Sequence, residues 1–247
     1  MKIDVLTLFP EMFVPVTDAS ILKKAGEKNL IDIKVTDIRD YTKNRHKKAD
    51  DYPLGGGQGM VMMPQPIFDA LDAVDGKNKK IIYMSPRGRI LDEEKIRELS
   101  AMSEFIIVCG HYEGIDQRAI DFWGMEEISI GDYILTGGEL PAMVLIDSVA
   151  RLIPGVLKGE ASALDESVYS GLLEYPQYTQ PRDYEGIKAP EVLLSGHHKN
   201  IEMWRFEQSL IITAERRPDL FEAFLEKRDM LGKDEKKVLE KVLAELK

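Results

Sequence analysis

Three glycine-bearing segments have the residue types and spacing to build a ligand site from main chain. They are Tyr83–Gly88, Gly110–Gly114 and Ile130–Pro141. Each follows an apolar run that predicts a β-strand, and parallel α/β sheets bind ligands in the loops at the carboxyl ends of their strands. Glycines allow a ligand to approach the backbone closely. Any one of these segments resembles an ordinary tight turn, but three at one sheet edge predict a nucleoside pocket.

A fourth glycine cluster, Leu54–Gly59, has a different character. No Lys-Ser or Lys-Thr follows it, so it is not a P-loop. It also does not open a helix after a strand, as a dinucleotide-binding fingerprint does. The cluster is either a flexible surface loop or a mobile flap over a substrate, and both interpretations remain open.

Metal and nucleophile chemistry have little support in the sequence. The histidines show no zinc-type spacing, so no metal ligand is assigned. Cys109 and His111 would share one face of an extended strand, which makes a cysteine hydrolase the rival enzyme class. A buried thiol at the end of a strand is the favoured interpretation, because a reactive cysteine needs an accessible, electropositive setting.

The elements that position these segments form an α/β domain with a largely parallel sheet. The predicted strands are Ile3–Leu8, Ile31–Ile38, Lys80–Met84, Phe105–Cys109 and Glu127–Ile130. A helix is predicted from Asp92, as its cap, to Met102. A second helix, with Pro141 in its first turn, is predicted to run to Ile153, where Pro154 and Gly155 end it.

Composition changes along the chain predict two domains. Residues 1–157 form the α/β domain, residues 158–172 a small, polar and acidic linker, and residues 173–247 a helical domain. Apolar periodicity predicts helices over Asn200–Arg217 and Asp219–Met230, with a last helix after Asp234. Pro218 and Gly232 separate them.

The charge balance bears on partners and location. The chain has 247 residues, a net charge of −10 and one cysteine. No targeting segment or membrane span is visible, so we expect a cytoplasmic protein. The acidic charge argues against nucleic acid, except at a local patch. The basic run Lys43–Lys48 is either a solvated loop or an RNA contact.

The ordered motifs together are similar to one family. They are Leu6–Phe13, Gly55–Met60, Cys109–Asp116, Ser129–Pro141, Arg151–Leu157, Gly171–Thr179 and Leu194–His198. In this order they resemble the bacterial tRNA (guanine-N1)-methyltransferases, often called TrmD, of the knotted SPOUT class. The resemblance runs nearly end to end and is highly specific.

The resemblance implies a fold, a reaction and a set of contacts. The fold would be a trefoil-knotted α/β domain followed by a small helical tRNA-binding domain. The enzyme would be a homodimer that moves a methyl group from S-adenosylmethionine to N1 of the guanine at position 37 of tRNA, beside the anticodon, with magnesium as a possible requirement. The implied cofactor contacts are Tyr83, Met84, Ser85, Pro86, Gly110, Tyr112, Glu113, Gly114, Ile130, Gly131, Tyr133, Leu135, Gly137, Gly138 and Pro141.

The resemblance also implies catalytic residues. The family's general base is an aspartate followed by Ser-Phe, whereas this chain has Glu166 before Ser167 and Val168, with Asp165 just upstream. We expect Glu166 to remove the N1 proton, with Asp165 as the alternative. Arg151 would stabilise the charge that develops on the guanine O6. Without the resemblance, an exposed linker acid and a helix-end cation would be the simpler interpretations.

The predicted RNA contacts lie on or near the first helix of the helical domain. They are Lys199, Arg205, Arg216 and Arg217. A non-catalytic RNA-binding protein with an inactive α/β domain is the second hypothesis, because the linker acid departs from the family pattern. The family resemblance also implies that each active site is shared between the two subunits.

Overall fold

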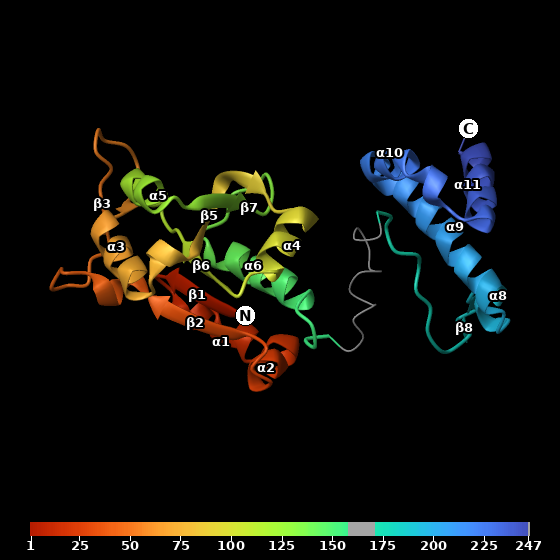
Figure 1. Ribbon diagram of the computed structural model, residues 1–247, viewed down its shortest axis with the longest axis horizontal. Helices are drawn as coiled ribbons and strands as arrows, with labels where there is room; N and C mark the ends of the chain where they lie inside the picture. Colours follow the sequence, from red (N-terminus) through yellow and green to blue (C-terminus); the bar gives the residue numbers. More distant parts are fainter. Residues whose placement is uncertain (158–170, 247) are drawn as a thin grey trace. The chain divides into compact units, whose positions relative to one another are not determined.

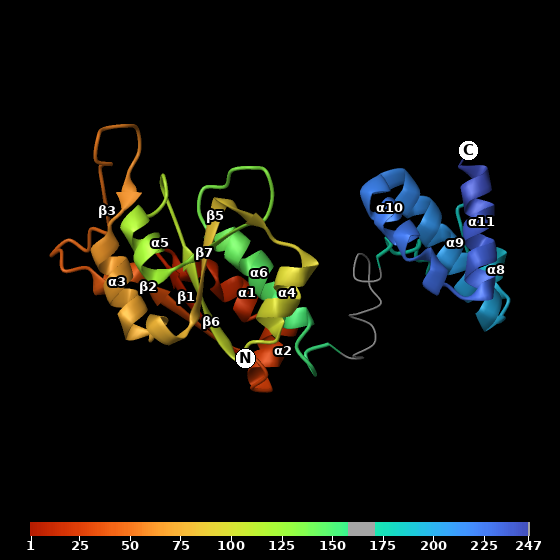
Figure 2. The same cartoon turned by 45° about the horizontal axis from the view of Figure 1, so that its top comes forward.

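The computed structural model describes residues 1–157 and 171–246 (Figures 1 and 2). The chain divides into two compact units, residues 1–160 and 161–247.

The first unit is built on a parallel five-stranded sheet. Its strands are β1 (Lys2–Thr7), β2 (Asp32–Asp37), β5 (Lys80–Ile90), β6 (Glu104–Cys109) and β7 (Glu126–Ser129). Their order is β2-β1-β6-β5-β7, and every pair is parallel. The predicted α/β class and the five predicted strands are confirmed.

Helices cover both faces of this sheet, as Figure 2 shows. Alternate residues of β6 serve the two faces: Phe105 and Ile107 pack into one apolar core, and Ile106 and Val108 into the other. The first core also holds residues of α2 (Ser20–Glu27), α4 (Glu93–Ser100) and α6 (Glu139–Arg151), and Val16 of α1 (Val14–Thr17) packs against it. The second holds residues of α3 (Pro64–Ala73) and α5 (Gln117–Trp123). Strands buried on both faces explain the nearly continuous apolar runs of the sequence.

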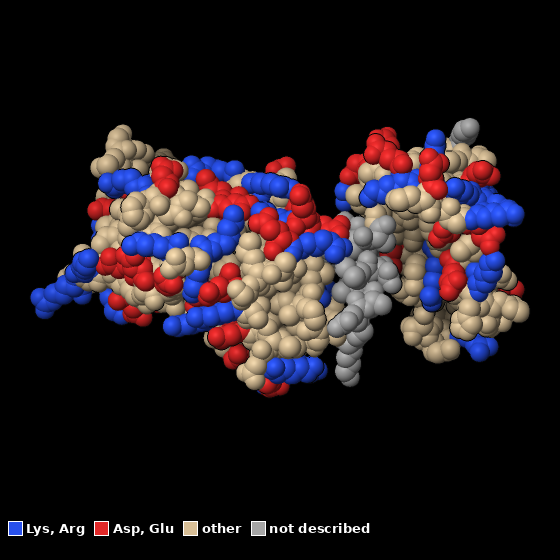
Figure 3. Space-filling model, in the orientation of Figure 1, with Lys and Arg blue, Asp and Glu red and all other residues tan. Residues whose placement is uncertain are grey.

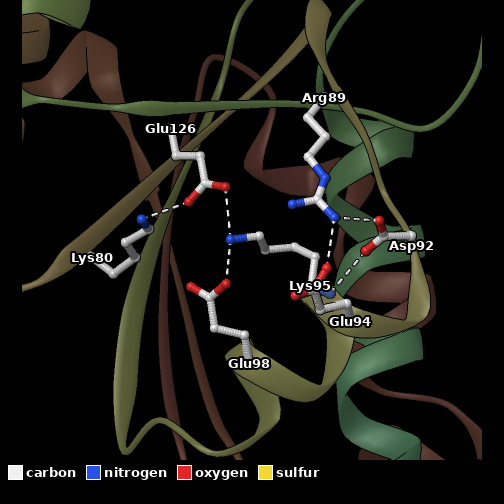
Figure 4. A network of polar contacts seen from close by, with 7 residues as sticks. All are labelled: Lys80, Arg89, Asp92, Glu94, Lys95, Glu98 and Glu126. Carbon is white, nitrogen blue, oxygen red and sulfur yellow. Dashed lines mark hydrogen bonds and ion pairs between the residues drawn. The ribbon is translucent and has the colours of Figure 1, made fainter.

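Polar contacts near its N-terminal end fix helix α4 to the sheet (Figure 4). Asp92 caps it by accepting a hydrogen bond from the Lys95 backbone N–H at 2.9 Å, as predicted. The Lys95 side chain is only 9% exposed and reaches Glu126 of β7 at 2.8 Å. It also contacts Glu98, while Lys80 pairs with Glu126 at 2.5 Å. The buried Lys95 ammonium therefore has two carboxylate partners.

Two predicted boundaries in this unit are wrong. Strand β5 does not end at Met84 but continues to Ile90, with an irregular register against β7 between Met84 and Arg89. A Cβ on Gly88 would lie 2.3 Å from the Glu127 carbonyl carbon, so only glycine permits this pairing. Helix α6 ends at Arg151 rather than Ile153, because a residue before proline disfavours the helical conformation.

The second unit contains the helices of the C-terminal part. They are α8 (Glu191–Leu194), α9 (His198–Arg216), α10 (Pro218–Glu226) and α11 (Lys233–Glu245), and a hairpin of β8 (Asp183–Tyr184) and β9 (Ile187–Lys188) precedes them. Leu210, Phe221 and Val242 belong to their common core. The helix predicted over Asp219–Met230 ends at Glu226, and a 3-10 turn, Arg228–Met230, follows. Residues 226–230 are exposed, so no burial favours a longer helix.

Candidate active site

A cavity of about 310 Å³ opens at the carboxyl ends of the neighbouring strands β6, β5 and β7. Its wall contains every residue that the sequence predicted as a cofactor contact, from Tyr83 to Pro141. The wall also contains residues that the prediction omitted, which are Arg87, His111, Ile115, Ile128, Ser129, Ile134 and Thr136. The three glycine-bearing segments therefore meet at one cavity, as expected for loops at the carboxyl ends of parallel strands.

The floor of the cavity is main chain from two loops. The Gly138 N–H donates to the Gly110 carbonyl at 2.7 Å, and His111 forms an antiparallel bridge with Gly137. A Cβ on Gly138 would lie 2.9 Å from the Cys109 Cα. The loop that follows β7 is thus held tightly over the end of β6, and this close approach requires glycine.

Tyr83 forms a rigid part of the wall. The side chain is 5% exposed, and a Cβ on Gly110 would lie 2.8 Å from its ring. Burial is the main cause that raises the pKa of the Tyr83 hydroxyl. Tyr83 is therefore suited to shaping the cavity and not to proton transfer at neutral pH.

Arg87 is the cationic side chain that the sequence prediction missed. It lies inside the segment Tyr83–Gly88 and could have been included on that ground. It pairs with Glu127 at 3.2 Å and donates to Gln117 at 3.1 Å. Both partners are on neighbouring elements, so Arg87 joins the β5 segment to β7 and α5.

The glycine cluster Leu54–Gly59 lies in the loop between β3 (Asp50–Asp51) and β4 (Val61–Met62). Its base is joined to the cavity wall: the Glu113 N–H donates to the Met60 carbonyl at 3.0 Å, and the Met62 N–H donates to the Gly114 carbonyl at 2.9 Å. A movement of this loop would therefore also shift the backbone of Glu113 in the cavity wall. Its role as a flap stays a prediction.

The predicted catalytic residues are not gathered at the cavity. Glu166 and Asp165 lie outside the described residues. Arg151 is the half-buried last residue of α6 and does not line the cavity. It follows Glu139, at the cavity end of the same helix, by twelve residues, a separation of about 18 Å. Arg151 cannot reach the cavity of its own chain across this distance.

The rival nucleophile has the wrong environment. Cys109 is fully buried, and this burial, with a smaller effect from the Glu139 charge, raises the pKa of its thiol well above the usual range. A nucleophilic cysteine needs the opposite shift. Within residues 1–157 and 171–246, no group of three or more His, Cys, Asp or Glu side chains could hold a metal ion.

The predicted RNA contacts fall into two groups. Lys199 pairs with Asp234, and Arg217 with Asp219, each at 2.5 Å. The Arg205 guanidinium instead stacks over the Tyr175 ring at 4.8 Å, and its buried Nε has no hydrogen-bond partner among the described residues. Arg216 is exposed. Figure 3 shows acidic and basic side chains intermixed on the face it presents, with no continuous basic field there.

The basic run Lys43–Lys48 is largely neutralised by the first unit's own acids. Lys43 pairs with Asp69 at 3.0 Å, Lys47 with Asp40 at 2.7 Å, and Lys48 with Asp51 at 3.0 Å. Its exposed Arg45 is the cation that remains for a contact with RNA.

The chain is similar to one family of known proteins. A family model described as tRNA (Guanine-1)-methyltransferase TrmD matches residues 1–223. A tRNA (guanine-N(1)-)-methyltransferase of Ruminiclostridium cellulolyticum is 60% identical over 224 residues, which cover 90% of this chain and 96% of the relative. A relative of the same name from Clostridium perfringens is 57% identical, and the match covers 93% of this chain and 98% of the relative. Another from Clostridioides difficile is 52% identical, and the match covers 92% of this chain and 100% of the relative.

Among the described helices, none has the length and apolar character to cross a membrane.

Proposed function

The chain belongs to the tRNA (guanine-1)-methyltransferase TrmD family, and we propose that it transfers a methyl group from S-adenosylmethionine to N1 of guanine 37 in tRNA, in the cytoplasm. The observation that carries this proposal is the cavity at the ends of β6, β5 and β7, whose wall contains every residue expected at the methyl donor. The names of the relatives do not favour the alternative of a non-catalytic RNA-binding protein.

The cavity fits a nucleoside-sized donor. Its volume of about 310 Å³ is in the range of small-molecule sites. Exposed main-chain groups of its glycine loops can bind a base and a ribose. These loops lie so close to neighbouring residues that a Cβ added at Gly110 or Gly138 would meet Tyr83 or Cys109 at 2.8–2.9 Å. We propose no residue for magnesium.

In the proposed mechanism, Glu166 takes the N1 proton, since neutral guanine is a poor nucleophile at that atom. Arg151 binds O6, where negative charge develops as the proton leaves. Bound S-adenosylmethionine supplies an activated methyl group: its carbon bonds to N1, and the electron pair of the broken carbon–sulfur bond stays on sulfur. The cavity loops contribute by alignment, which is a large part of the rate of such transfers.

The position of Arg151 supports the proposal of a homodimer with shared sites. This residue is about 18 Å along α6 from the cavity end of the helix, so the arginine at each cavity would come from the partner subunit. Leu140 and Val144, one turn apart on α6, are 48% and 45% exposed. Met12 and Val14, on the same side of the sheet, are also exposed. Exposed apolar surface of this kind is typical of an interface.

We extend the proposal to the trefoil knot and the tRNA-binding role of the second unit. Because β5 lies between β6 and β7, the chain that leaves β7 must cross the end of β5 to bond Gly138 to Gly110. This crossing supports a threaded path. In the second unit, Arg205 and Arg216 are the preferred tRNA contacts, because acidic side chains already neutralise Lys199 and Arg217.

Nucleoside analysis of tRNA tests the proposed reaction directly. Transcribed tRNA with guanine at positions 36 and 37 is incubated with the protein and labelled S-adenosylmethionine, then digested. Labelled N1-methylguanosine is the expected product, and tRNA with adenine at position 37 is the control. Absence of this product would refute the proposal.

Mixed dimers test the sharing of sites. A variant with a blocked cavity, Gly138→Val, is combined with Glu166→Gln, each being inactive as a homodimer. With shared sites, one site of each heterodimer has both an intact cavity and an intact acid, so about half the wild-type activity returns. If purified heterodimers stay inactive, acid and cavity belong to the same chain. Asp165→Asn in place of Glu166→Gln should leave the homodimer active.

A further inference from the structure

A buried acid behind the cavity has no part in the mechanism above. Glu139, the first residue of α6, is 2% exposed. The Thr7 hydroxyl donates to its Oε1 at 2.7 Å. Its Oε2 lies 3.9 Å from Nδ1 of His111, which is too long for a hydrogen bond. Within the described residues, this Nδ1 is buried and has no hydrogen-bond partner.

The Glu139 carboxylate stands directly behind the cavity wall. A Cβ on Gly137 would lie 2.3 Å from Oε2 and 2.6 Å from the His111 Nδ1, and both Gly137 and His111 line the cavity. Glycine backbone and one imidazole ring therefore separate the carboxylate from a ligand. The hydroxyl of Thr7 and the N-terminal end of α6 both favour a negative charge here.

The Glu139 charge also acts on the end of β6, beside the cavity. The Glu139 charge contributes to the raised pKa of Cys109, the residue before Gly110. Other charges near the cavity are less effective: Glu113 is exposed to water, and Arg87 is paired with Glu127. Water screens an exposed charge strongly, whereas a buried charge acts through a medium of low dielectric constant.

We infer that Glu139 is a specificity-determining residue that favours the cationic methyl donor over its neutral demethylated product. This inference rests on the proposed function, because the donor carries a sulfonium and the product a thioether. The two ligands share their adenosine and amino-acid parts, so contacts to those parts cannot distinguish them. A fixed negative charge behind the wall can distinguish them, because it attracts the sulfonium of the donor and not the thioether of the product. It would therefore favour release of the product after methyl transfer.

Calorimetry with two ligands tests this role without any turnover. The affinities of the full chain for S-adenosylmethionine and S-adenosylhomocysteine are measured separately, and their ratio is the readout. Glu139→Gln should lower the affinity for S-adenosylmethionine about tenfold, the size expected for the loss of one charge acting across a low-dielectric wall. The affinity for S-adenosylhomocysteine should change less than twofold. Glu139→Asp, which keeps the charge, should keep the ratio.

Equal losses for the two ligands in Glu139→Gln would overturn the inference and leave Glu139 a packing role only. If Glu139→Gln does not fold, the wild-type chain decides: it should bind S-adenosylmethionine more tightly than S-adenosylhomocysteine, and equal or reversed affinities overturn the inference. Failure of both ligands to bind the wild-type chain would instead refute the proposed methyl donor.

Discussion

The two units of this chain prepare for their ligands in different ways. In the α/β unit, the cavity is formed by three loops whose main chain is locked in place, as between Gly138 and Gly110. In the helical unit, the candidate groups are side chains on helix surfaces, and nearby acids already neutralise some of them. A ligand site of the first kind is sensitive to added atoms, whereas a site of the second kind is sensitive to removed charges.

The largest effect is expected where the backbone is most crowded. Gly138→Val places side-chain atoms where even a Cβ would lie 2.9 Å from the Cys109 Cα and the Gly110 nitrogen. Because main chain cannot yield easily, we expect the affinity for S-adenosylmethionine to fall about a hundredfold. Gly26→Val in α2 is the control, since the nearest atom to its Cβ is 3.9 Å away. Calorimetry measures both, and equal affinities for the two variants would contradict the crowding argument.

The next effect concerns stability of the α/β unit alone. Lys95→Met removes the buried partner of Glu126 and Glu98, and we expect the free energy of unfolding of this unit to fall by roughly 2–3 kcal/mol. Urea unfolding followed by Trp123 fluorescence, in a Trp204→Phe background, reports on this unit. Lys77→Met is the control, because Lys77 is exposed and 3.7 Å from Asp72. A similar loss in both variants would show that burial of Lys95 is unimportant.

The same network predicts a pH dependence. Burial raises the pKa of Glu126, but Lys80 and Lys95 lower it more, so the net pKa is below the usual value. A carboxyl with a lowered pKa in the folded state contributes stability above its unfolded pKa, and this contribution is lost as the pH falls through the folded pKa. The wild-type chain should therefore lose more stability on acidification below the normal range of glutamate than Glu126→Gln does. Parallel acid-unfolding curves for the two proteins would contradict this expectation.

The sequence predicted most of the α/β unit because its signals are local. Apolar runs identified the five strands, and their parallel order brought the three glycine-bearing segments to one cavity. Other features depend on contacts between distant residues. Continuation of β5 past Met84 depends on pairing with β7. The lack of a hydrogen-bond partner for the His111 Nδ1 among the described residues depends on how the loops after β6 and β7 pack against the start of α6. The pairing of Lys199 with Asp234, 35 positions apart, could not be predicted from the sequence either.

A tenfold effect on tRNA binding is expected at Arg205. Its guanidinium is held over the Tyr175 ring, and no acidic side chain among the described residues pairs with it, so the charge is available to a phosphate. Arg205→Gln should lower tRNA affinity about tenfold. Arg217→Gln is the matched control, because Asp219 already neutralises Arg217, and it should change affinity less than twofold. Filter binding measures both, and a reversed order would show that ion pairing does not decide which cations contact RNA.

The smallest expected effect comes from removing an acid that neutralises a lysine, instead of removing a cation. If Asp234 withholds Lys199 from tRNA, Asp234→Asn should release this lysine and raise tRNA affinity about two- to threefold. The slope of log affinity against log salt should steepen by at most about one, since one phosphate contact is added. Asp229→Asn changes the net charge equally, but no lysine of the described residues pairs with the Asp229 carboxylate: Lys236 contacts its backbone carbonyl instead. A steeper slope in Asp234→Asn alone would identify a specific lysine contact. Equal gains in both variants would instead reflect the overall charge of the helical unit, and the distinction between paired and unpaired cations would then have no bearing on tRNA binding.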